Sequence, residues 1–570
     1  MLFRSLQDLN AIGERVVSNY GRDAALSYKG VSVGKPLQTL NKQLRALIDN
    51  VLDDPKLTEE QKEAKIKDIG YKYTQKIQDA VFEDQNKRGT ALASQINSGS
   101  RGNKTQLMQL MFGNMMMKDA LNRDIPYLHV DPFMSGTSPM AYWVASSSGR
   151  KGMYDVQAAT GQAGYLSKQV TGVTHDVMIT EQDCGTEDTG TPFKAADPQN
   201  IGRVLLRPFH KYPAGTVVTA KMLEEADDDE EMILRTPMTC KARHGICARC
   251  NGLGANGKFP GVGDYIALTS ARTFTEKITQ SGISSKHAGG VGGKKQIDPE
   301  GEDQPTGFAN IERMFQAQQN FPGGAVLSPV DGIVTSIRPA AQGGNYITVG
   351  SQTLYCAPER TFKVRVGDRV TAGDSLTNGV PNPAEVVKYK GIGEGRTYYM
   401  NKLGDIFKRS GFGVDRSNLE AFSRAAIDKV RITNADGYNS YLPGDIVNYS
   451  EIAADYKPRD NAKKLSPDKA LNQYLESPIL NYNIGARVTP AMAKSLTSHG
   501  FNEVTVSPDP PPFESVFMRP SAALQQDRHW LPRLAGERLY DSLFDATRRG
   551  LTDGYDSTSY VDRIIALPFK

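Results

Sequence analysis

Residues 138–186 read SPMAYWVASSSGRKGMYDVQAATGQAGYLSKQVTGVTHDVMITEQDCGT, and the rest of the chain is organised around this stretch. It follows a Ser-Gly-Thr turn, which is typical of a helix start, and no proline interrupts it after Pro139. A continuous helix over residues 139–173 would be about 50 Å long. Because several interior glycines each cost up to about 1 kcal/mol against alanine, we expect either one helix that bends or a break into two helices.

These glycines admit a second interpretation. They are Gly149, Gly152, Gly161, Gly164 and Gly172. Instead of allowing bending, they could belong to a buried connecting helix and let neighbouring elements pack closely against it. Their spacing alone does not separate the two interpretations.

The composition is ordinary for a soluble protein with several domains. Of the 570 residues, 39% are hydrophobic and 23% are charged. No apolar run reaches the roughly 18 residues of a membrane-spanning helix, and the N-terminus lacks the apolar region of a signal peptide. The net charge of +4 does not by itself indicate nucleic acid. Five cysteines do not make a disulfide framework, so we expect a reducing compartment.

The strongest chemical signal is the cysteine group CKARHGICARC at residues 240–250. The Cys247-x-x-Cys250 spacing lets two thiolates share one ion at about 2.3 Å, and Cys240 supplies a third thiolate. A tetrahedral site then lacks one ligand. The nearest candidates are Cys184, His210 and His244. We expect Cys356, which lies apart, to be a buried apolar residue.

Other regions carry clear structural patterns. The loop SGSRGNK at 98–104 opens a helix, so its free backbone N–H groups could hold an anion. Residues 38–52 and 58–86 have features of amphipathic helices, the second beginning with a capping-box-like Thr-Glu-Glu-Gln, and we expect a helical hairpin. Residues 324–380 alternate in short runs with Asp-Gly and Gly-Asp turns, which predicts a small β barrel.

Several motifs, collinear over about residues 26–570, together resemble one family: the largest subunit (β′) of multisubunit RNA polymerase. The motifs similar to its bridge helix and the exit of that helix are Arg150-Lys151-Gly152, Asp155, Gly164-Tyr165-Leu166 and Asp183-Cys184-Gly185-Thr186. The motifs similar to its trigger loop are Ala271, Glu276, Thr279-Gln280, His287-Ala-Gly-Gly290 and the return helix Phe308–Phe315. Because the motifs agree in order, the resemblance is specific.

The resemblance implies an α+β multidomain fold. Its parts are a long bridge helix, trigger-loop helices, a four-cysteine zinc site, a small β barrel-sandwich module and a helical C-terminal clamp base. The expected regions are 1–95 (strand and rim-helix-like hairpin), 96–137 (loop and helix before the bridge), 138–180 (bridge helix), 181–255 (zinc-binding region), 256–322 (trigger loop), 323–382 (β module), 383–505 (mixed helices and strands) and 506–570 (clamp base).

The resemblance also implies site residues. It selects Cys184 to complete a closed, structural zinc site with the three cysteines at 240, 247 and 250. Arg101 would bind the triphosphate, Gln280 would lie near the sugar and base, and His287 would be the catalytic residue over the triphosphate. Thr160-Gly161 would face the template base during translocation. Ile283 and Ser284 stand where many members have methionine and arginine.

One motif of the family is missing. No Asn-Ala-Asp-Phe-Asp-Gly-Asp occurs, so these residues lack the aspartates that hold the catalytic Mg²⁺. The resemblance therefore implies the C-terminal half of a split β′, as in giant bacteriophages, working in the cytoplasm of an infected host. Its partners would be an N-terminal β′-like chain with the Mg²⁺ aspartates, β-like subunits, DNA template, RNA product and nucleoside triphosphates. A promoter-specificity subunit and packaging in the virion stay open.

Two other functions remain as alternatives. The chain could be a non-catalytic, zinc-stapled structural or nucleic-acid-binding protein with a degenerate polymerase fold. It could also be a biotin- or lipoate-type carrier, which the β module resembles. The absence of a lysine at the hairpin position that a carrier modifies disfavours the carrier.

Overall fold

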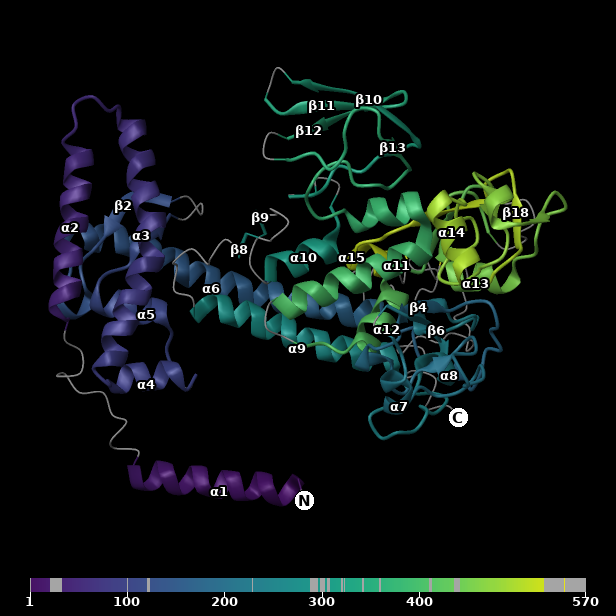
Figure 1. Cartoon of the computed structure of the whole chain (residues 1–570), viewed down its shortest axis with the longest axis horizontal. Coiled ribbons are helices and arrows are strands. Elements are labelled where there is room, and N and C mark those ends of the chain that lie inside the picture. Colours follow the sequence, from purple (N-terminus) through teal and green to yellow (C-terminus); the bar gives the residue numbers. More distant parts are fainter. Residues whose placement is uncertain are drawn as a thin grey trace. The chain divides into compact units, whose positions relative to one another are not determined.

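The computed structural model in Figure 1 describes residues 2–20, 33–99, 101–119, 124–227, 229–287, 296–297, 303–304, 308–318, 321, 323–340, 343–357, 360–409, 413–434, 441–526 and 548. The chain forms two compact units, which we describe separately. The first comprises residues 1–160 and 283–294, and the second comprises residues 161–282 and 295–570. The expected N-terminal strand would lie at residues 29–34, most of which are outside the described residues, as is the expected clamp base beyond Gln526 except Arg548.

The first unit is built on a helical hairpin. Thr58 Oγ1 accepts a hydrogen bond from Gln61 N at 3.3 Å, and Gln61 Oε1 accepts one from Thr58 N at 3.1 Å, so the expected capping box is confirmed. The elements are α1 (Leu2–Tyr20), α2 (Lys35–Leu52), α3 (Glu59–Lys87), α4 (Ala91–Asn97), α5 (Lys104–Met111), and the antiparallel strands β1 (Met115–Lys118) and β2 (Asp124–His129).

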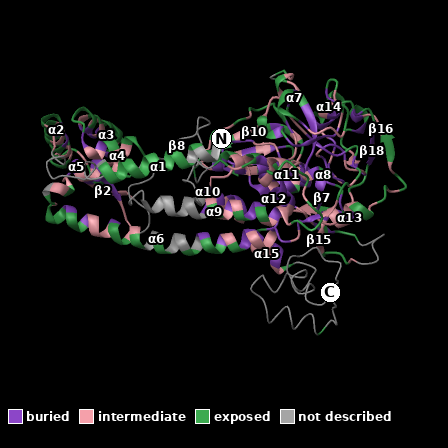
Figure 2. Cartoon of the chain, turned by 90° about the horizontal axis from the view of Figure 1, so that it is seen from below, coloured by how far each residue is buried: buried purple, intermediate pink, exposed green. Residues whose placement is uncertain are grey.

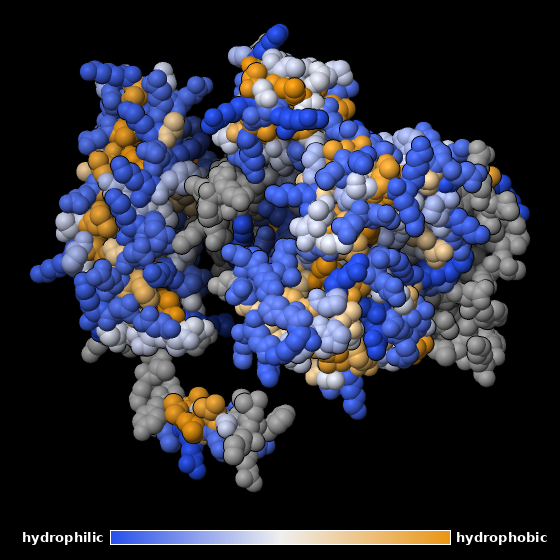
Figure 3. Space-filling model, turned by 45° about the vertical axis from the view of Figure 1, so that its right-hand side comes forward, coloured by the Kyte–Doolittle hydropathy of each residue, from blue (hydrophilic) through white to orange (hydrophobic). Residues whose placement is uncertain are grey.

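The core of this unit lies between the hairpin, α5 and the two strands. Leu44, Ile77 and Val81 of the hairpin are buried together with the methionines of residues 108–117. These methionines therefore pack in a core, where their flexible side chains fill irregular space. By contrast, α1 exposes an apolar face, visible in Figure 3; its exposed side chains include Leu9, Ile12, Val16 and Val17.

The long stretch forms one helix, α6 (Pro139–Val173), with the predicted bounds. Large side chains along it are exposed, among them Trp143 at 71% and Met153 at 78% (Figure 2). Among the described residues, a Cβ added at Gly149, Gly152, Gly161 or Gly164 would meet no atom within 4 Å. Close packing against the described part of the chain therefore does not require these four glycines. Only at Gly172 would a Cβ clash, with Leu524 Cδ1 at 2.6 Å.

The core of the second unit is formed by helices that pack through aromatic side chains. Phe422 has its ring centroid 5.1 Å from Phe274 and 5.3 Å from Phe315. Tyr399 is fully buried beside them. The helices are α9 (Ile266–His287), α10 (Phe308–Gln316), α11 (Pro383–Arg409, kinked at Gly391) and α12 (Arg416–Ala426). The helix expected at 308–315 is thus present as α10, and helices are present in the expected region from 383.

The expected β module is present between α10 and α11. Its sheet has the strand order β12-β11-β10-β13, and isolated bridges join Leu327 to Ser375 and Phe362 to Thr377. The strands are β10 (Gly332–Pro339), β11 (Asn345–Val349), β12 (Gln352–Cys356) and β13 (Arg369–Val370). Cys356 is buried in its core, and burial raises the pKa of its thiol to about 11.

Two segments of the second unit, 270 residues apart, have the same fold. In each segment the chain forms a strand, a short 3-10 helix, a second strand, a tight hairpin, a helix and a third strand. The first and second strands both pair antiparallel with the third. The first copy is β4 (Thr191–Lys194), η3 (Pro198–Asn200), β5 (Val204–Leu205), α7 (Ala220–Glu224) and β6 (Glu231–Arg235). The second copy is β16 (Lys463–Leu465), η5 (Pro467–Ala470), β17 (Tyr474–Leu475), α14 (Pro490–Ser498) and β18 (Val504–Ser507).

The match between the copies extends to backbone details. His210 and Leu480 both have positive φ, 48° and 49°, and Gly215 and Gly485 follow with 82° and 83°. Residues identical at the shared spacing are Leu205/Leu475, Pro208/Pro478, Tyr212/Tyr482, Gly215/Gly485, Val218/Val488, Thr219/Thr489 and Met222/Met492. The segments are a structural repeat with a matching sequence pattern.

The two copies pack against each other. Leu206 and Ile233 of the first copy belong to the buried cluster formed mainly by the second copy. Leu480 N donates to Asp188 O at 2.8 Å, and Gly190 N donates to Leu480 O at 3.2 Å. The remaining elements around them are β3 (Ile179–Glu181), η4 (Pro237–Thr239), β7 (Ile246–Cys247), α8 (Ala248–Asn251), β14 (Lys429–Ile432), β15 (Ile446–Asn448), α13 (Tyr449–Asp455), β19 (Phe513–Val516) and α15 (Pro520–Gln525).

Candidate metal centre

Four cysteines from distant parts of the sequence come together beside the first copy of the repeat. Cys240 follows η4, Cys247 ends β7 and caps α8, and Cys250 lies in α8. Cys184 joins them because β3 pairs in parallel with β7, with Ile246 N donating to Met178 O at 2.9 Å. The parallel pair thus carries the chain that follows α6 to the cysteine group.

A glycine makes this close approach possible. Gly245 has a φ of +61°, a conformation that favours glycine, and an added Cβ would lie 2.2 Å from Met178 O. Thr180 Oγ1 donates to His244 O at 2.7 Å on the same turn. The turn before β7 therefore requires a residue without a side chain.

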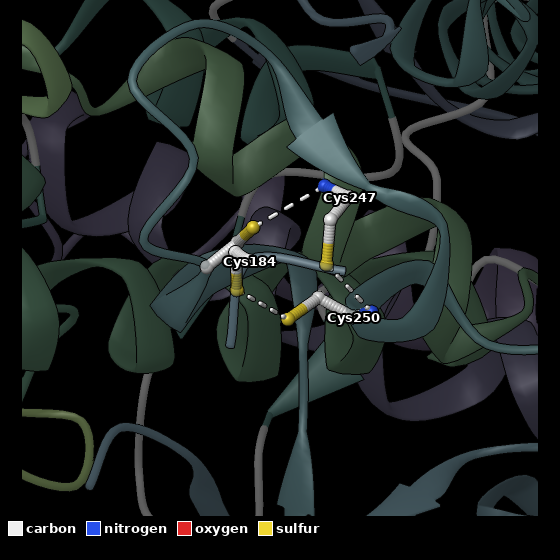
Figure 4. Close-up of side chains that lie close together, drawn as sticks. Cys184, Cys247 and Cys250 are labelled. Atoms are coloured by element: carbon white, nitrogen blue, oxygen red, sulfur yellow. Dashed lines mark hydrogen bonds between the residues drawn. The ribbon is translucent and has the colours of Figure 1, made fainter. Parts of the chain in front are cut away.

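The ligand atoms of the four cysteines all lie within 4.8 Å of one another. Figure 4 shows Cys184, Cys247 and Cys250 with their sulfur atoms turned toward one another. The Cys184 and Cys250 sulfurs are 3.7 Å apart, close to the roughly 3.8 Å edge of a sulfur tetrahedron around an ion with bonds of about 2.3 Å. All four cysteines are free thiols rather than disulfides, so the group could hold a metal ion.

Without a metal ion, the surroundings favour the thiolate form at Cys184, and this thiolate raises the pKa of Cys240 and of Cys250. Cys240 Sγ accepts from Cys247 N at 3.3 Å, and Cys247 Sγ accepts from Cys250 N at 3.3 Å. The neighbouring thiol of Cys240, and then those of Cys247 and Cys250, lower the pKa of Cys184 far below its ordinary value. Cys240, Cys247 and Cys250 are buried, which leaves little access for a water ligand. A closed site of this kind is structural rather than catalytic.

A guanidinium group also touches the sulfurs. Arg235 Nη2 donates to Cys184 Sγ at 3.5 Å and to Cys247 and Cys250 Sγ at 3.6 Å each. It donates to Asp183 Oδ1 at 2.5 Å, and this bond holds the pKa of Asp183 below its ordinary value. Burial opposes the charge of Arg235, but Asp183 and the sulfurs outweigh it and raise the pKa of Arg235.

The four predicted metal ligands are therefore the ones that lie together, and Cys184 is the fourth. His210 instead lies 2.7 Å from Glu230 through Nε2, and His244 offers its backbone carbonyl to Thr180. Sequence reasoning did not find Arg235 or Asp183. Only the position of Asp183, directly before Cys184, could have pointed to it.

The other predicted site residues are only partly described. Arg101 is exposed, in a loop before α5, and its backbone N donates to Gln95 O at 3.4 Å. Thr160 and Gly161 lie within α6, and Gly161 is exposed. Gln280 and His287 lie in α9, and His287 is its last residue, but their side chains are outside the described residues. The roles of these residues remain predictions.

The segment that follows α6 is hydrogen-bonded directly to the residues at the start of α9. Ile179 N donates to Asp264 O at 2.9 Å, and Ala267 N donates to Val177 O at 3.2 Å. The cysteine group lies on the adjoining strand pair, and its buried cluster includes Ala267 of α9. The metal centre therefore joins the exit of one long helix to the beginning of another.

Comparison with known proteins matches these elements to one family. The model of the family "RNA polymerase Rpb1, domain 5" matches residues 136–328, which include α6, the four cysteines, α9 and α10. The β′ subunit of DNA-directed RNA polymerase from Pelotomaculum thermopropionicum is 28% identical over 419 residues, covering 70% of this chain and 35% of the relative. The β′ subunit from Desulforudis audaxviator is 29% identical over 379 residues, covering 62% and 32%.

A more distant β′ subunit, from Chloroflexus aggregans, is 26% identical over 476 residues, covering 70% of this chain and 31% of the relative. The chain thus spans about a third of the length of the curated relatives it matches. No helix among the described residues is long and apolar enough to cross a membrane. The family match and these relatives show that the chain is similar to the C-terminal part of the β′ subunit of DNA-directed RNA polymerase.

Proposed function

We propose that this chain supplies the C-terminal β′ part of a split, multisubunit DNA-directed RNA polymerase of the giant-phage type. The observation that carries the proposal is the link between α6, the four cysteines and α9, all inside the segment matched by the Rpb1 domain. In this proposal a partner β′-like chain holds the Mg²⁺ aspartates, whose motif does not occur in these residues. The chain acts with β-like subunits in the cytoplasm of an infected bacterium.

In this proposal α6 is the bridge helix. Its uninterrupted length and exposed large side chains support that role, because such a helix needs partners beyond this chain. Thr160 and Gly161, near its middle, face the template base. Open space around Gly149, Gly152 and Gly161 gives the helix freedom to bend during translocation.

Residues between α9 and α10 form the trigger loop, which closes as a lid over the correct nucleotide. The support is that α9 ends at His287 and α10 begins at Phe308, while Phe274 and Phe315 anchor both helices against α12. His287 and Arg101 offset charge on the triphosphate, and Gln280 contacts the sugar and base.

The four cysteines bind one Zn²⁺. Zinc fits four cysteine sulfurs that lie within 4.8 Å of one another, three of them in buried residues, and four protein ligands leave no position for water. When bound, it crosslinks the exit of α6 to the segment that leads into α9. It supplies folding free energy and takes no part in nucleotide addition.

The first test is affinity purification of the tagged chain from its native source. We expect a chain with the Asn-Ala-Asp-Phe-Asp-Gly-Asp motif and β-like subunits in equal amounts, and RNA synthesis on a DNA template by the complex. Recovery of the chain alone, without RNA synthesis, would contradict the proposal. That outcome would favour a zinc-stapled structural or nucleic-acid-binding protein.

The second test concerns the lid. In the assembled enzyme His287→Ala should slow single-nucleotide addition by about 10-fold or more, the effect of removing a positioned acid or charge. His499→Ala, which removes a histidine that pairs with Glu231 through Nε2 at 3.0 Å, should leave the rate unchanged. An unchanged rate for His287→Ala refutes its role while leaving the polymerase assignment intact.

A further inference from the structure

Arg235 stands out as a buried charge at the cysteine group. It ends β6, is only 5% exposed, and lies five positions before Cys240. One atom, Nη2, lies 3.5–3.6 Å from the sulfurs of Cys184, Cys247 and Cys250. These three sulfurs form one face of the four-sulfur group, and the guanidinium covers that face.

Charge explains why a cation belongs there. Four thiolates around one divalent ion carry a net charge of −2, and a charge buried without compensation is costly. Cys240, Cys247 and Cys250 are at most 5% exposed, so water offsets little of that charge. The guanidinium of Arg235 is the cation within hydrogen-bonding distance of the sulfurs among the described residues.

Asp183 orients this cation. Its Oδ1 accepts from Arg235 Nη2 at 2.5 Å and from Gly185 N at 2.9 Å, and its Oδ2 lies 3.4 Å from Arg249 Nε. Because Asp183 directly precedes Cys184, the same turn that supplies one ligand also holds the guanidinium over the others. All of these contacts are made by Nη2, and a guanidinium, whose charge is delocalised and weakly hydrated, suits such a buried position better than the strongly hydrated ammonium of lysine.

We propose that Arg235, oriented by Asp183, is a positioning residue that closes the face formed by Cys184, Cys247 and Cys250 and slows loss of the bound metal. The inference rests on the proposed zinc site and deepens it. Metal ligands in proteins are commonly held by such outer partners, whose removal lowers metal affinity by roughly 10- to 100-fold. Arg235 balances the charge of the site and shields its sulfurs from competing chelators.

The test uses the full chain purified with its metal. Elemental analysis gives zinc per chain, and the rate of zinc transfer to excess chelator is followed by absorbance well below the unfolding temperature. Arg235→Gln should release zinc about 10-fold faster or more. Arg235→Lys keeps the charge but loses the planar group, so its rate should fall between those of Arg235→Gln and the wild type.

Arg416→Gln is the matched control. Arg416 is 8% exposed and pairs with Asp197 at 2.8 Å and Glu420 at 3.1 Å, without contacting a sulfur. Its loss lowers stability through a buried ion pair but should leave the zinc transfer rate within about twofold of the wild type. Equal acceleration in Arg416→Gln and Arg235→Gln would overturn the inference, because general destabilisation would then explain both.

Other outcomes are also decisive. If Arg235→Gln does not fold, Asp183→Asn takes its place; Asp183 is partly exposed, and loosening the guanidinium should still accelerate zinc transfer. If the wild-type chain holds one zinc and the variants transfer it at the wild-type rate, the role of Arg235 is overturned but the proposed zinc site is not. A wild-type chain that holds no zinc would overturn the proposed zinc site and this inference together.

Discussion

The two copies of the repeat share a fold but differ in the contacts that hold the two ends of each copy together. The first copy is flanked by Cys184 and Cys240, which lie together in the metal centre. The second copy is flanked by Arg459 and the carbonyls of Asp509 and Pro510, to which Arg459 donates at 2.6 and 2.8 Å. The chain thus joins the two ends of one module through sulfur ligands and of the other through a guanidinium.

The contacts that hold the ends of the second copy together are centred on a buried carboxylate. Glu476 is 1% exposed and accepts from Tyr456 Oη at 2.9 Å and from Arg459 Nε at 3.0 Å. The equivalent residue in the first copy is Leu206, which packs in the apolar cluster between the copies. We therefore expect a module of this fold to be stable without a metal where other contacts hold its two ends together.

Metal removal should produce the largest difference between the two copies, measured as hydrogen-exchange protection. With Cys247→Ser, or with zinc stripped from the full chain, the first copy should lose hydrogen-exchange protection over 204–218. The second copy should keep it over 474–488. Structural zinc contributes on the order of 10 kcal/mol in small domains, more than the rest of this small module supplies. Cys356→Ala, which removes a remote buried thiol, should leave both peptides protected. Equal loss in both copies would contradict independent closure.

Breaking the ion pair that holds the ends of the second copy together should give the next largest effect, a loss of unfolding free energy. Glu476→Ala leaves Arg459 without its buried partner and should cost about 3–5 kcal/mol, measured by denaturant unfolding. Glu514→Ala is the control, because its pair with Arg431 at 2.9 Å is about half exposed and should contribute under about 1 kcal/mol. If Glu476→Ala lost no more unfolding free energy than the control, the ion pair would not be what holds the second copy together.

A matched pair of glycines sharpens the comparison. Gly215 and Gly485 share a φ near 83°, where alanine costs about 1–2 kcal/mol. A Cβ on Gly485 would also lie 2.5 Å from Pro511 Cγ, whereas on Gly215 its nearest contact is Arg249 Nη1 at 3.6 Å. Gly485→Ala should therefore be the more destabilising by about 1–3 kcal/mol, measured as the difference in unfolding free energy. Equal losses of unfolding free energy would mean that the segment containing Pro511 moves to accommodate the added methyl group at little cost.

The contact between the copies should give the smallest effect. His499 Nε2 lies 3.0 Å from Glu231 Oε2, and Glu231 is about half exposed. Glu231→Gln should change stability by about 0.2–1 kcal/mol, because exposed ion pairs contribute little. A loss of several kcal/mol would show that the copies depend on this pair rather than on the apolar cluster of Leu206 and Ile233.

Local signals predicted local structure well. The absence of proline after Pro139 allowed one continuous helix in α6, the Thr58 capping box began α3, and the Cys-x-x-Cys spacing located the candidate metal centre. The fourth ligand needed the family resemblance, because Cys184 is separated from the others in sequence and only the parallel β3–β7 pair brings it close. Spacing alone cannot report such a long-range contact.

Two features were missed although the sequence carried a signal. No helix was predicted before residue 38, yet Leu2, Leu6, Leu9 and Val16 recur at helical spacing in α1. The repeat was missed because its shared residues, such as Tyr212 and Tyr482, are 270 positions apart and had not been compared with each other. Arg235 left no signal, since its role depends on a side-chain position that only the folded sheet defines.

The open glycines of α6 have a consequence for hydrogen exchange. Alanine at Gly149, Gly152, Gly161 and Gly164 would meet no neighbouring atom, so each glycine leaves the helix about 1 kcal/mol less stable than its surroundings allow. One kcal/mol is a factor of about five in an opening equilibrium, so four such positions raise the locally unwound population by several hundred-fold. Amides along this segment should therefore exchange far faster than those of an alanine-substituted helix of the same length.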